Sequence, residues 1–139
     1  MSWDGYIDNI IARSKDVFGV CHVDKACIIG INGKLWTTAG NANAIKLKQD
    51  EAYHIANCFK AKDFSLFITC GVVAEGLKYF FLKEDDGKIV YAKLKNHGAL
   101  TFQCSKTSII IAHTDDGYQL GSTNKAVYGI AKYLESRSM

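Results

Sequence analysis

The spacing of apolar residues at the start of the chain predicts an amphipathic helix. Ser2 is a suitable N-cap, and Asp4 stands in the first turn, where a negative charge is favourable. At ~100° per residue, one face of this helix carries the large apolar side chains of Trp3, Tyr6, Ile7, Ile10 and Ile11. Trp3 and Tyr6 are three residues apart and should lie side by side at its N-terminal end. They either pack into a core or form a binding surface.

Several runs of β-branched and aromatic residues predict strands. Residues 26–31 and 34–38 flank Asn32-Gly33, a strong short-range hairpin signal. Further runs cover residues 66–72, 77–83, 88–95, 99–104 and 107–112, separated by turn residues such as Asp-Gly and Asn-His-Gly. Short turns between successive strands favour an antiparallel sheet. Tyr79 and Phe81 alternate with Phe80 and Leu82, so we expect both faces of the sheet to be covered.

Two further segments have helical spacing. Residues 45–61 carry apolar side chains at helical intervals, with Asp50 and Glu51 near the beginning, and a second apolar stripe runs from about Thr123 to Leu134. The predicted order is helix, two strands, helix, five strands and helix. This order predicts an α/β fold of the α+β type around a central antiparallel sheet of six to seven strands.

Composition limits the possible classes of protein. The 139 residues are 48% hydrophobic, which predicts a single domain over residues 1–139 with a core that needs no disulfide or structural metal. We see no apolar run long enough to span a membrane and no signal-peptide pattern. Five cysteines, mostly in apolar contexts, indicate reduced thiols packed in the core. We therefore expect a cytoplasmic protein.

Motifs for catalysis or metal binding are lacking in the sequence. It contains no Cys-x-x-Cys, no glycine-rich phosphate loop and no Gly-x-Ser-x-Gly. His54 and Cys58 stand four apart, but two ligands do not make a metal site. Asp85-Asp86 and Asp115-Asp116 each precede a glycine, as turn-forming aspartates do. Binding is therefore a better class of function than catalysis, and we expect no cofactor and no metal.

Charge is unevenly distributed along the chain. The net charge of +3 is too small to predict binding to nucleic acid. Residues 78–106 nevertheless carry six lysines, namely Lys78, Lys83, Lys88, Lys93, Lys95 and Lys106. Such a surface suits an acidic partner or anionic lipid. It is equally typical of a solvated sheet face whose lysines prevent aggregation, and both interpretations stay open.

Several blocks of the chain, in one order, resemble the profilin family of small actin-monomer-binding proteins. The opening W-D-G-Y-I-D-N-I resembles the N-terminal signature of the family, and A-C-I-I-G-I-N-G-K-L-W-T-T-A-G resembles its first hairpin. G-L-K-Y-F-F-L-K and G-A-L-T-F-Q-C-S-K-T-S-I-I-I-A resemble its central strands, and G-S-T-N-K-A-V-Y-G-I-A-K-Y-L its last helix. The resemblance covers residues 2 to about 134.

This resemblance implies a binding site for proline-rich segments. In profilins the N- and C-terminal helices share one face of the sheet, short helices cover the other, and an aromatic groove binds polyproline. Trp3, Tyr6 and Trp36 match groove positions directly. Tyr133 stands where vertebrate members carry a histidine and plant members a tyrosine, and Met139 replaces the terminal tyrosine of vertebrate members.

The resemblance also implies a second surface, which binds monomeric actin. The matching positions lie on the central strands and around the start of the last helix: Lys78, Lys83, Lys93, Lys95, Tyr118, Gln119, Gly121, Asn124 and Lys125. Lys93, Lys95 and Lys125 are the candidates for phosphatidylinositol bisphosphate headgroups. The implied protein is a cytoplasmic, cytoskeleton-associated regulator of actin polymerisation and nucleotide exchange, not an enzyme. The alternative is a small regulatory sensor domain that holds a ligand within a similar fold.

Overall fold

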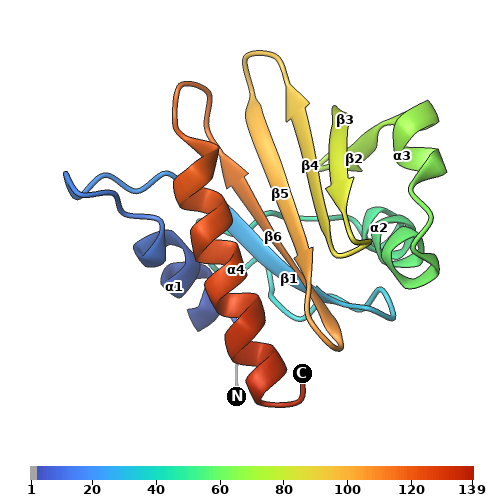
Figure 1. Ribbon diagram of the computed structural model, residues 1–139, viewed down its shortest axis with the longest axis horizontal. Helices are drawn as coiled ribbons and strands as arrows, with labels where there is room; N and C mark the ends of the chain where they lie inside the picture. The colour runs from blue at the N-terminus through green and yellow to red at the C-terminus, as the bar shows by residue number, and fades with distance from the viewer. Residues whose placement is uncertain (1–2) are drawn as a thin grey trace.

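The computed structural model describes residues 3–139, and six strands form one antiparallel sheet in the order β1-β6-β5-β4-β3-β2 (Figure 1). The elements along the chain are α1 (Gly5–Arg13), β1 (Lys25–Gly30), α2 (Gln49–Ala61), α3 (Ser65–Cys70), β2 (Val72–Ala74), β3 (Leu77–Asp85), β4 (Ile89–Leu94), β5 (Gly98–Cys104), β6 (Ser108–Thr114) and α4 (Leu120–Ser136). This architecture confirms the predicted fold class.

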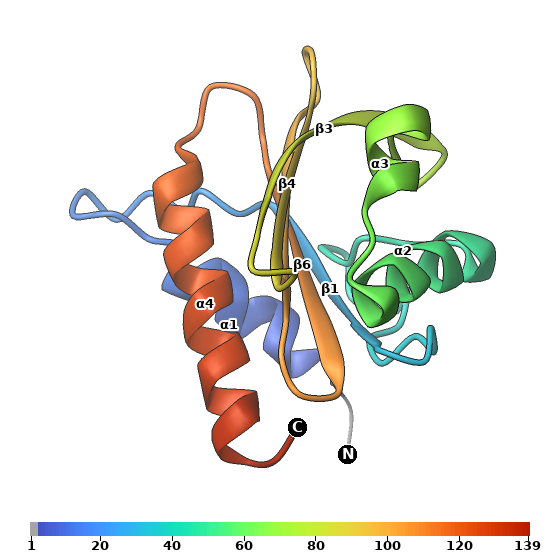
Figure 2. The ribbon, with the colours of Figure 1, turned by 45° about the vertical axis from the view of Figure 1, so that its right-hand side comes forward.

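Helices cover both faces of the sheet. Figure 2 shows α1 and α4 together on one face, and α2 and α3 on the other. The central strands β5 and β6 are buried almost throughout, so each contributes apolar side chains alternately to the two faces. The sheet therefore separates two hydrophobic cores.

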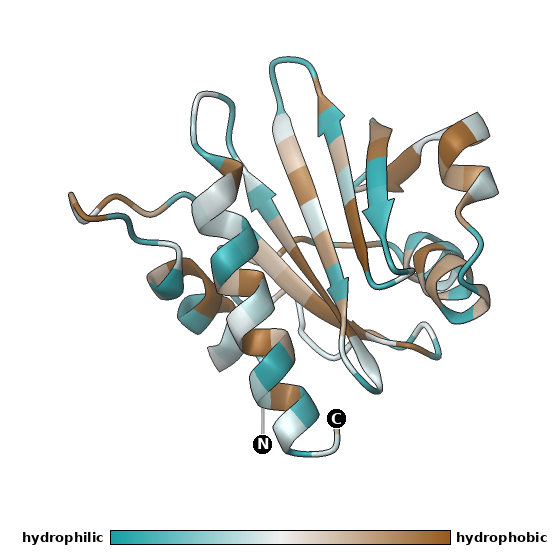
Figure 3. Cartoon of the chain, in the orientation of Figure 1, coloured by the Kyte–Doolittle hydropathy of each residue, from teal (hydrophilic) through white to brown (hydrophobic). Residues whose placement is uncertain are grey.

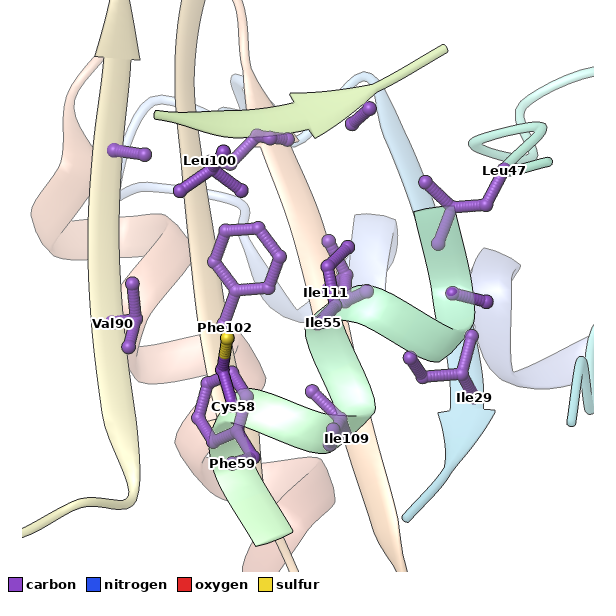
Figure 4. Close-up of a cluster of buried hydrophobic side chains, with 14 of the residues drawn as sticks. Ile29, Leu47, Ile55, Cys58, Phe59, Val90, Leu100, Phe102, Ile109 and Ile111 are labelled. Carbon is purple, nitrogen blue, oxygen red and sulfur yellow. The ribbon is translucent and has the colours of Figure 1, made fainter. Parts of the chain in front are cut away.

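The larger core lies between the sheet and the helices α2 and α3 (Figure 4). Phe102 of β5 and Phe67 of α3 are completely buried there, with ring centroids 6.5 Å apart. Phe59 of α2 packs 6.2 Å from Phe102. Large aromatic and Ile side chains thus fill the region in which the alternative sensor fold would hold a ligand.

The smaller core lies between the sheet and the two terminal helices. Ile7 and Ile10 of α1 meet Val127 and Ile130 of α4 above Ile110 of β6, and all five are buried. The buried positions on α4 recur at three- and four-residue intervals, as expected for an amphipathic helix on a sheet. This core fixes α1 against α4.

The first helix begins later than the sequence predicts. It starts at Gly5, and Asp4 occupies the N-cap, whereas the predicted cap Ser2 lies outside the described residues. The Tyr6 N–H donates to the Trp3 carbonyl oxygen over 3.0 Å, so Trp3 stands in a turn before the helix. The turn still keeps Trp3 and Tyr6 adjacent.

The prediction of a second strand over residues 34–38 is wrong. Only Leu35 forms a bridge, to Ile29, because two segments share the outer edge of β1. The N–H groups of Trp36 and Thr37 donate to the carbonyl oxygen of Ile28, while Ala26 bonds residues 43 and 45 further along the same edge. The turn at Asn32-Gly33 forms as expected, but the returning chain leaves β1 early.

The prediction of a strand over residues 66–72 is also wrong, because most of this run forms helix α3. Just before α3, Asp63 Oδ1 accepts hydrogen bonds from the N–H and hydroxyl of Ser65, the first residue of the helix. Phe64 and Phe67, three residues apart, are buried, whereas Ile68 is exposed. Helical burial of two phenylalanines outweighs the strand preference of the β-branched residues.

The five cysteines are unpaired thiols, as predicted. Cys27 and Cys58 are buried, and burial raises the pKa of both thiols. Cys70, at the end of α3, is exposed, so the prediction of a core position is wrong for this residue.

Within residues 3–139, each helix is too short or too polar to cross a lipid bilayer.

His113, near the end of β6, connects three segments. Its Nδ1 lies 2.6 Å from Asp24 Oδ1, and its Nε2 lies within hydrogen-bond distance of the His97 carbonyl oxygen. Burial lowers the pKa of His113, but the hydrogen bond to Asp24, its negative charge and the His97 carbonyl oxygen outweigh burial. The pKa of His113 is therefore raised above its ordinary value.

The raised pKa of His113 predicts a pH-dependent stability. The contribution of His113 is fully present below its unfolded pKa of about 6.5 and is lost as pH rises through the folded pKa. We expect the free energy of unfolding, measured with urea, to fall between about pH 6 and 8, and His113→Gln to flatten this slope. His97→Gln, which keeps the backbone carbonyl, is the matched control. An unchanged slope in His113→Gln would contradict the assignment.

Candidate functional site

Four aromatic rings form one continuous cluster where α1 begins and α4 ends. The ring centroids of Trp3 and Trp36 are 4.6 Å apart, and those of Trp3 and Tyr6 are 5.2 Å apart. Tyr6 and Tyr133 continue the row with centroids 6.5 Å apart. The four residues come from three segments that are distant in sequence, so folding creates this cluster. We call Trp3, Tyr6, Trp36 and Tyr133 the aromatic cluster.

The aromatic cluster packs against the smaller core on one side and is partly exposed to solvent on the other. Trp3, Tyr6 and Trp36 pack against the smaller core but are only partly buried, and 43% of Tyr133 is exposed. Met139 also packs against this core, and its terminal oxygen accepts hydrogen bonds from the hydroxyl groups of Ser105 and Thr107. The C-terminal residue is thereby held beside the same core. Partly exposed rings on a fixed base can stack against a ligand at little cost in entropy.

Asp4 holds the two tryptophan segments together. Its Oδ1 accepts the backbone N–H of Thr38 over 2.7 Å, and its Oδ2 accepts the Thr38 hydroxyl over 2.5 Å. Both hydrogen bonds lower the pKa of Asp4, and the bond from the Thr38 hydroxyl has the larger effect. Thr38 follows Trp36 by two residues, so this contact sets where Trp36 lies relative to Trp3. Sequence reasoning gave Asp4 only a role in the first helical turn and missed this contact, because no local pattern pairs residues 34 apart.

The surroundings of Tyr6 raise the pKa of its phenol. Burial is the largest cause of this rise, and the neighbouring Tyr133 raises the Tyr6 pKa further. The guanidinium carbon of Arg137 lies 5.9 Å from the centre of the Tyr133 ring, a cation–π arrangement. The positive charge of Arg137 partly opposes the rise in the Tyr6 pKa. The Tyr6 phenol therefore stays protonated at neutral pH and can donate a hydrogen bond.

A second feature is an open region of the sheet beside α4. Helix α4 packs on β5 and β6, whereas β3 and β4 present exposed side chains on the same face. Phe80 and Leu82 of β3 are 65% and 51% exposed. The expectation that both faces are covered is therefore wrong for these two residues, and neither fills the core. We call this region the open face.

Three predicted lysines share the open face. Phe80 pairs with Lys93, and a bulge after Phe81 brings Lys83 opposite Tyr91. Because side chains alternate along strands, Lys83 and Lys93 point to the same side as Phe80, and so does Lys78. Lys83 Nζ lies 5.3 Å from the Tyr91 ring centre. All three lysines are exposed.

Two shallow hollows connect the open face with the start of α4. Lys93 and Lys95 line one with Phe80, Leu82 and Asp116. Lys93 also borders a second hollow, together with Tyr118 and Gly117. The structure thus brings together the strand lysines and the loop before α4. The sequence analysis did not predict that Phe80 and Leu82 are exposed, although their alternation with the buried Tyr79 is typical of a strand with one exposed face.

The remaining candidates at the start of α4 divide between two environments. Gln119 and Gly121 are exposed, and the Asn124 side-chain oxygen accepts the Thr101 hydroxyl of β5 over 2.9 Å. Lys125 lines a different hollow, with Gln119 and Arg13 and without the strand lysines. The predicted headgroup trio is therefore split, with Lys93 and Lys95 together and Lys125 apart.

Neither feature resembles a catalytic or metal centre. Across residues 3–139, no three His, Cys, Asp or Glu side chains are grouped as metal ligands would be. His54 packs with its ring 6.0 Å from Phe67, and Cys58 is buried in the larger core. Asp86 and Asp115 serve turns: Asp86 has a positive φ of 54°, and Asp115 accepts the N–H of Tyr118 through its carbonyl oxygen. The arrangement is suited to binding.

Comparison with known proteins gives a consistent result. A family model described as Profilin matches residues 1–139. A profilin of Heliocidaris crassispina is 60% identical over 140 residues, covering 100% of both chains. Profilin II of Acanthamoeba castellanii is similar in structure, with a TM-score of 0.80 at 25% identity over 99% of this chain and 100% of that one. Mouse profilin IIa, solved with a double repeat from the FH1 domain of mDia1, has a TM-score of 0.71 at 20% identity and full coverage of both chains.

The contact between Asp4 and Thr38 predicts the effect of removing the carboxylate. In Asp4→Ala, the segment that carries Trp36 loses both hydrogen bonds to α1, so the two indoles should no longer be held in contact. We expect the near-ultraviolet circular dichroism of the tryptophans to weaken while the far-ultraviolet spectrum is unchanged. Asp63→Ala removes a comparable carboxylate at the start of α3 and should leave both spectra unchanged. A full-strength tryptophan signal in Asp4→Ala would refute this role.

Proposed function

This chain belongs to the profilin family, and we propose that it binds monomeric actin with one surface and proline-rich segments with another. The contact between Trp3 and Trp36, at 4.6 Å, is the observation that carries the proline-binding assignment, because it joins distant segments into one aromatic surface. The protein would act in the cytoplasm, in association with the cytoskeleton. It would do so by binding alone, without a catalytic step.

The aromatic cluster suits the polyproline II helix. This helix is extended and preorganised, and its carbonyl oxygens have no internal hydrogen-bond partners. Flat rings can stack on the proline rings, while indole N–H and phenol O–H groups donate to those carbonyl oxygens. Tyr6 and Tyr133 supply phenols at one end of the cluster, and Trp3 and Trp36 supply indoles at the other.

The open face suits actin, which is an acidic protein. Lys78, Lys83 and Lys93 would provide electrostatic attraction, and the exposed Phe80 and Leu82 would provide apolar contact area. Lys95, Tyr118, Gln119, Gly121, Asn124 and Lys125 would extend this surface around the start of α4. Tighter binding to an actin conformation that releases nucleotide quickly would promote exchange without any catalytic residue.

Phosphoinositide headgroups would bind at the edge of the same surface. Lys93 and Lys95 line one hollow and can contact one headgroup together. Lys125 would contribute through general electrostatic attraction, because it lines a different hollow. Exposed single lysines contribute little to affinity, so the pair is the main determinant of this proposal.

The first functional prediction concerns Trp3. Trp3→Ala removes the ring that contacts both Tyr6 and Trp36, so the dissociation constant for a proline decamer, measured by fluorescence titration, should rise at least about 30-fold. Tyr128→Ala is the matched control, because Tyr128 is an exposed aromatic of α4 outside the aromatic cluster. Wild-type affinity in a folded Trp3→Ala protein would sink the assignment.

The second functional prediction concerns Lys125. Lys125→Glu reverses a charge at the start of α4 and should weaken actin binding about tenfold, roughly 1.4 kcal/mol, because it repels an acidic partner. Affinity for the proline decamer should be unchanged. Lys60→Glu makes the same change on α2, on the opposite face of the sheet, and should alter neither affinity.

The outcome that would disprove the arrangement of two surfaces is also specific. It is a Lys125→Glu protein that loses affinity for the proline decamer and still binds actin as tightly as the wild type. In that case the start of α4, not its end, would belong to the proline-binding site.

A further inference from the structure

The turn between α1 and β1 carries the most exposed large apolar side chains of the described chain. Val17 is 93% exposed and Phe18 is 87% exposed. In Figure 1 this turn is the blue loop that projects at the left, away from the helices, and Figure 3 shows brown, hydrophobic colouring at its tip. Apolar side chains that project in this way are unfavourable in water unless they meet a partner.

Hydrogen bonds within the turn hold this tip in a fixed shape. Asp16 Oδ1 accepts the N–H groups of Phe18 and Val20, over 2.8 and 3.1 Å. The Asp16 carbonyl oxygen accepts the N–H of Gly19, and the Asp16 N–H donates to Val20. Lys15 and Cys21 form a bridge below. The backbone N–H groups of residues 18–20 thus already have partners, which lowers the cost of transferring them to a medium of low polarity.

Cationic side chains surround the base of the turn. Arg13 ends α1, Lys15 precedes the turn and Lys125 lies on α4, and all three line one hollow with Val17 and Phe18. Asp16 also lines this hollow, but its Oδ2 lies 2.8 Å from His22 Nε2, and its Oδ1 is bonded to the turn. The base of the turn therefore carries three positive charges and a single carboxylate that is already hydrogen-bonded.

We propose that the Val17–Phe18 tip inserts into the interface of an anionic lipid bilayer, with Arg13, Lys15 and Lys125 contacting the headgroups. An apolar tip in which the N–H groups of residues 18–20 are hydrogen-bonded suits the acyl boundary, and the cations at its base suit negatively charged headgroups. A protein partner would need a pocket whose shape matches Phe18. A bilayer accepts an apolar side chain of any shape, and its anionic headgroups attract the cations. The hollow at this tip shares no lining residue with the hollow of Lys93 and Lys95, although Lys125 is also one of the candidate actin and phosphoinositide residues.

Co-sedimentation with vesicles tests the proposal. The vesicles contain phosphatidylcholine with phosphatidylserine and no phosphoinositide, which separates this surface from the headgroup site proposed above. The wild type should sediment with these vesicles and not with pure phosphatidylcholine. The double variant Val17→Ser/Phe18→Ser should lose at least about tenfold in partitioning, because it removes the apolar area that would be buried.

Matched controls separate insertion from general effects. Ile68→Ser changes an exposed apolar residue on α3, 68% exposed, and should leave partitioning unchanged. Lys15→Gln should weaken partitioning and reduce its sensitivity to salt. Proline-decamer affinity should stay at the wild-type value in every variant, which confirms that each is folded.

Three results would overturn the proposal. The first is equal partitioning of the wild type and the Val17→Ser/Phe18→Ser variant, and the second is no binding of the wild type to the phosphatidylserine vesicles. The third is a double variant that keeps its vesicle binding but loses affinity for actin, which would assign the tip to the protein interface around Gln119 and Lys125.

Discussion

The structure depends on a sheet whose central strands carry apolar side chains on both faces. β5 and β6 are buried almost from end to end, so helices must cover each side of them. Helix α4 covers these two strands on one face and does not cover the region of β3 and β4 around Phe80. The same constraint therefore builds the core and leaves one part of the sheet accessible.

Two surfaces with different physical character follow from this arrangement. The smaller core fixes α1 beside α4, and the beginning of one helix and the end of the other bring Tyr6 and Tyr133 together. Asp4 then fastens the segment of Trp36 to the same place through Thr38. The other end of α4 lies near the open face, because Tyr118, just before the helix, borders a hollow with Lys93 of β4. Helix α4 has 17 residues, about 25 Å at 1.5 Å per residue, so its length separates the aromatic cluster from the candidate actin residues.

Much of this could be predicted from the sequence, and the failures have physical causes. Turn residues and alternation identified β3 to β6, and the apolar stripe identified α4, because these signals are local. Residues 66–72 were misassigned because β-branched residues favour strands until burial of Phe64 and Phe67 decides for a helix. The segment after Asn32-Gly33 was misassigned because a second segment, residues 43–45, takes part of the edge of β1.

The sites show the same division between local and distant information. Trp3, Tyr6, Trp36 and Tyr133 were predicted through resemblance, and the structure brings their rings together. The role of Asp4 could not be predicted, since Thr38 lies 34 residues away. The exposure of Phe80 depends on which strands α4 covers, and no local pattern specifies this.

The most direct test of the two-surface account is sedimentation velocity of the protein mixed with monomeric actin and a fluorescent proline-rich peptide. The account predicts a ternary complex in which the peptide sediments with actin, and displacement of the peptide by actin would contradict it.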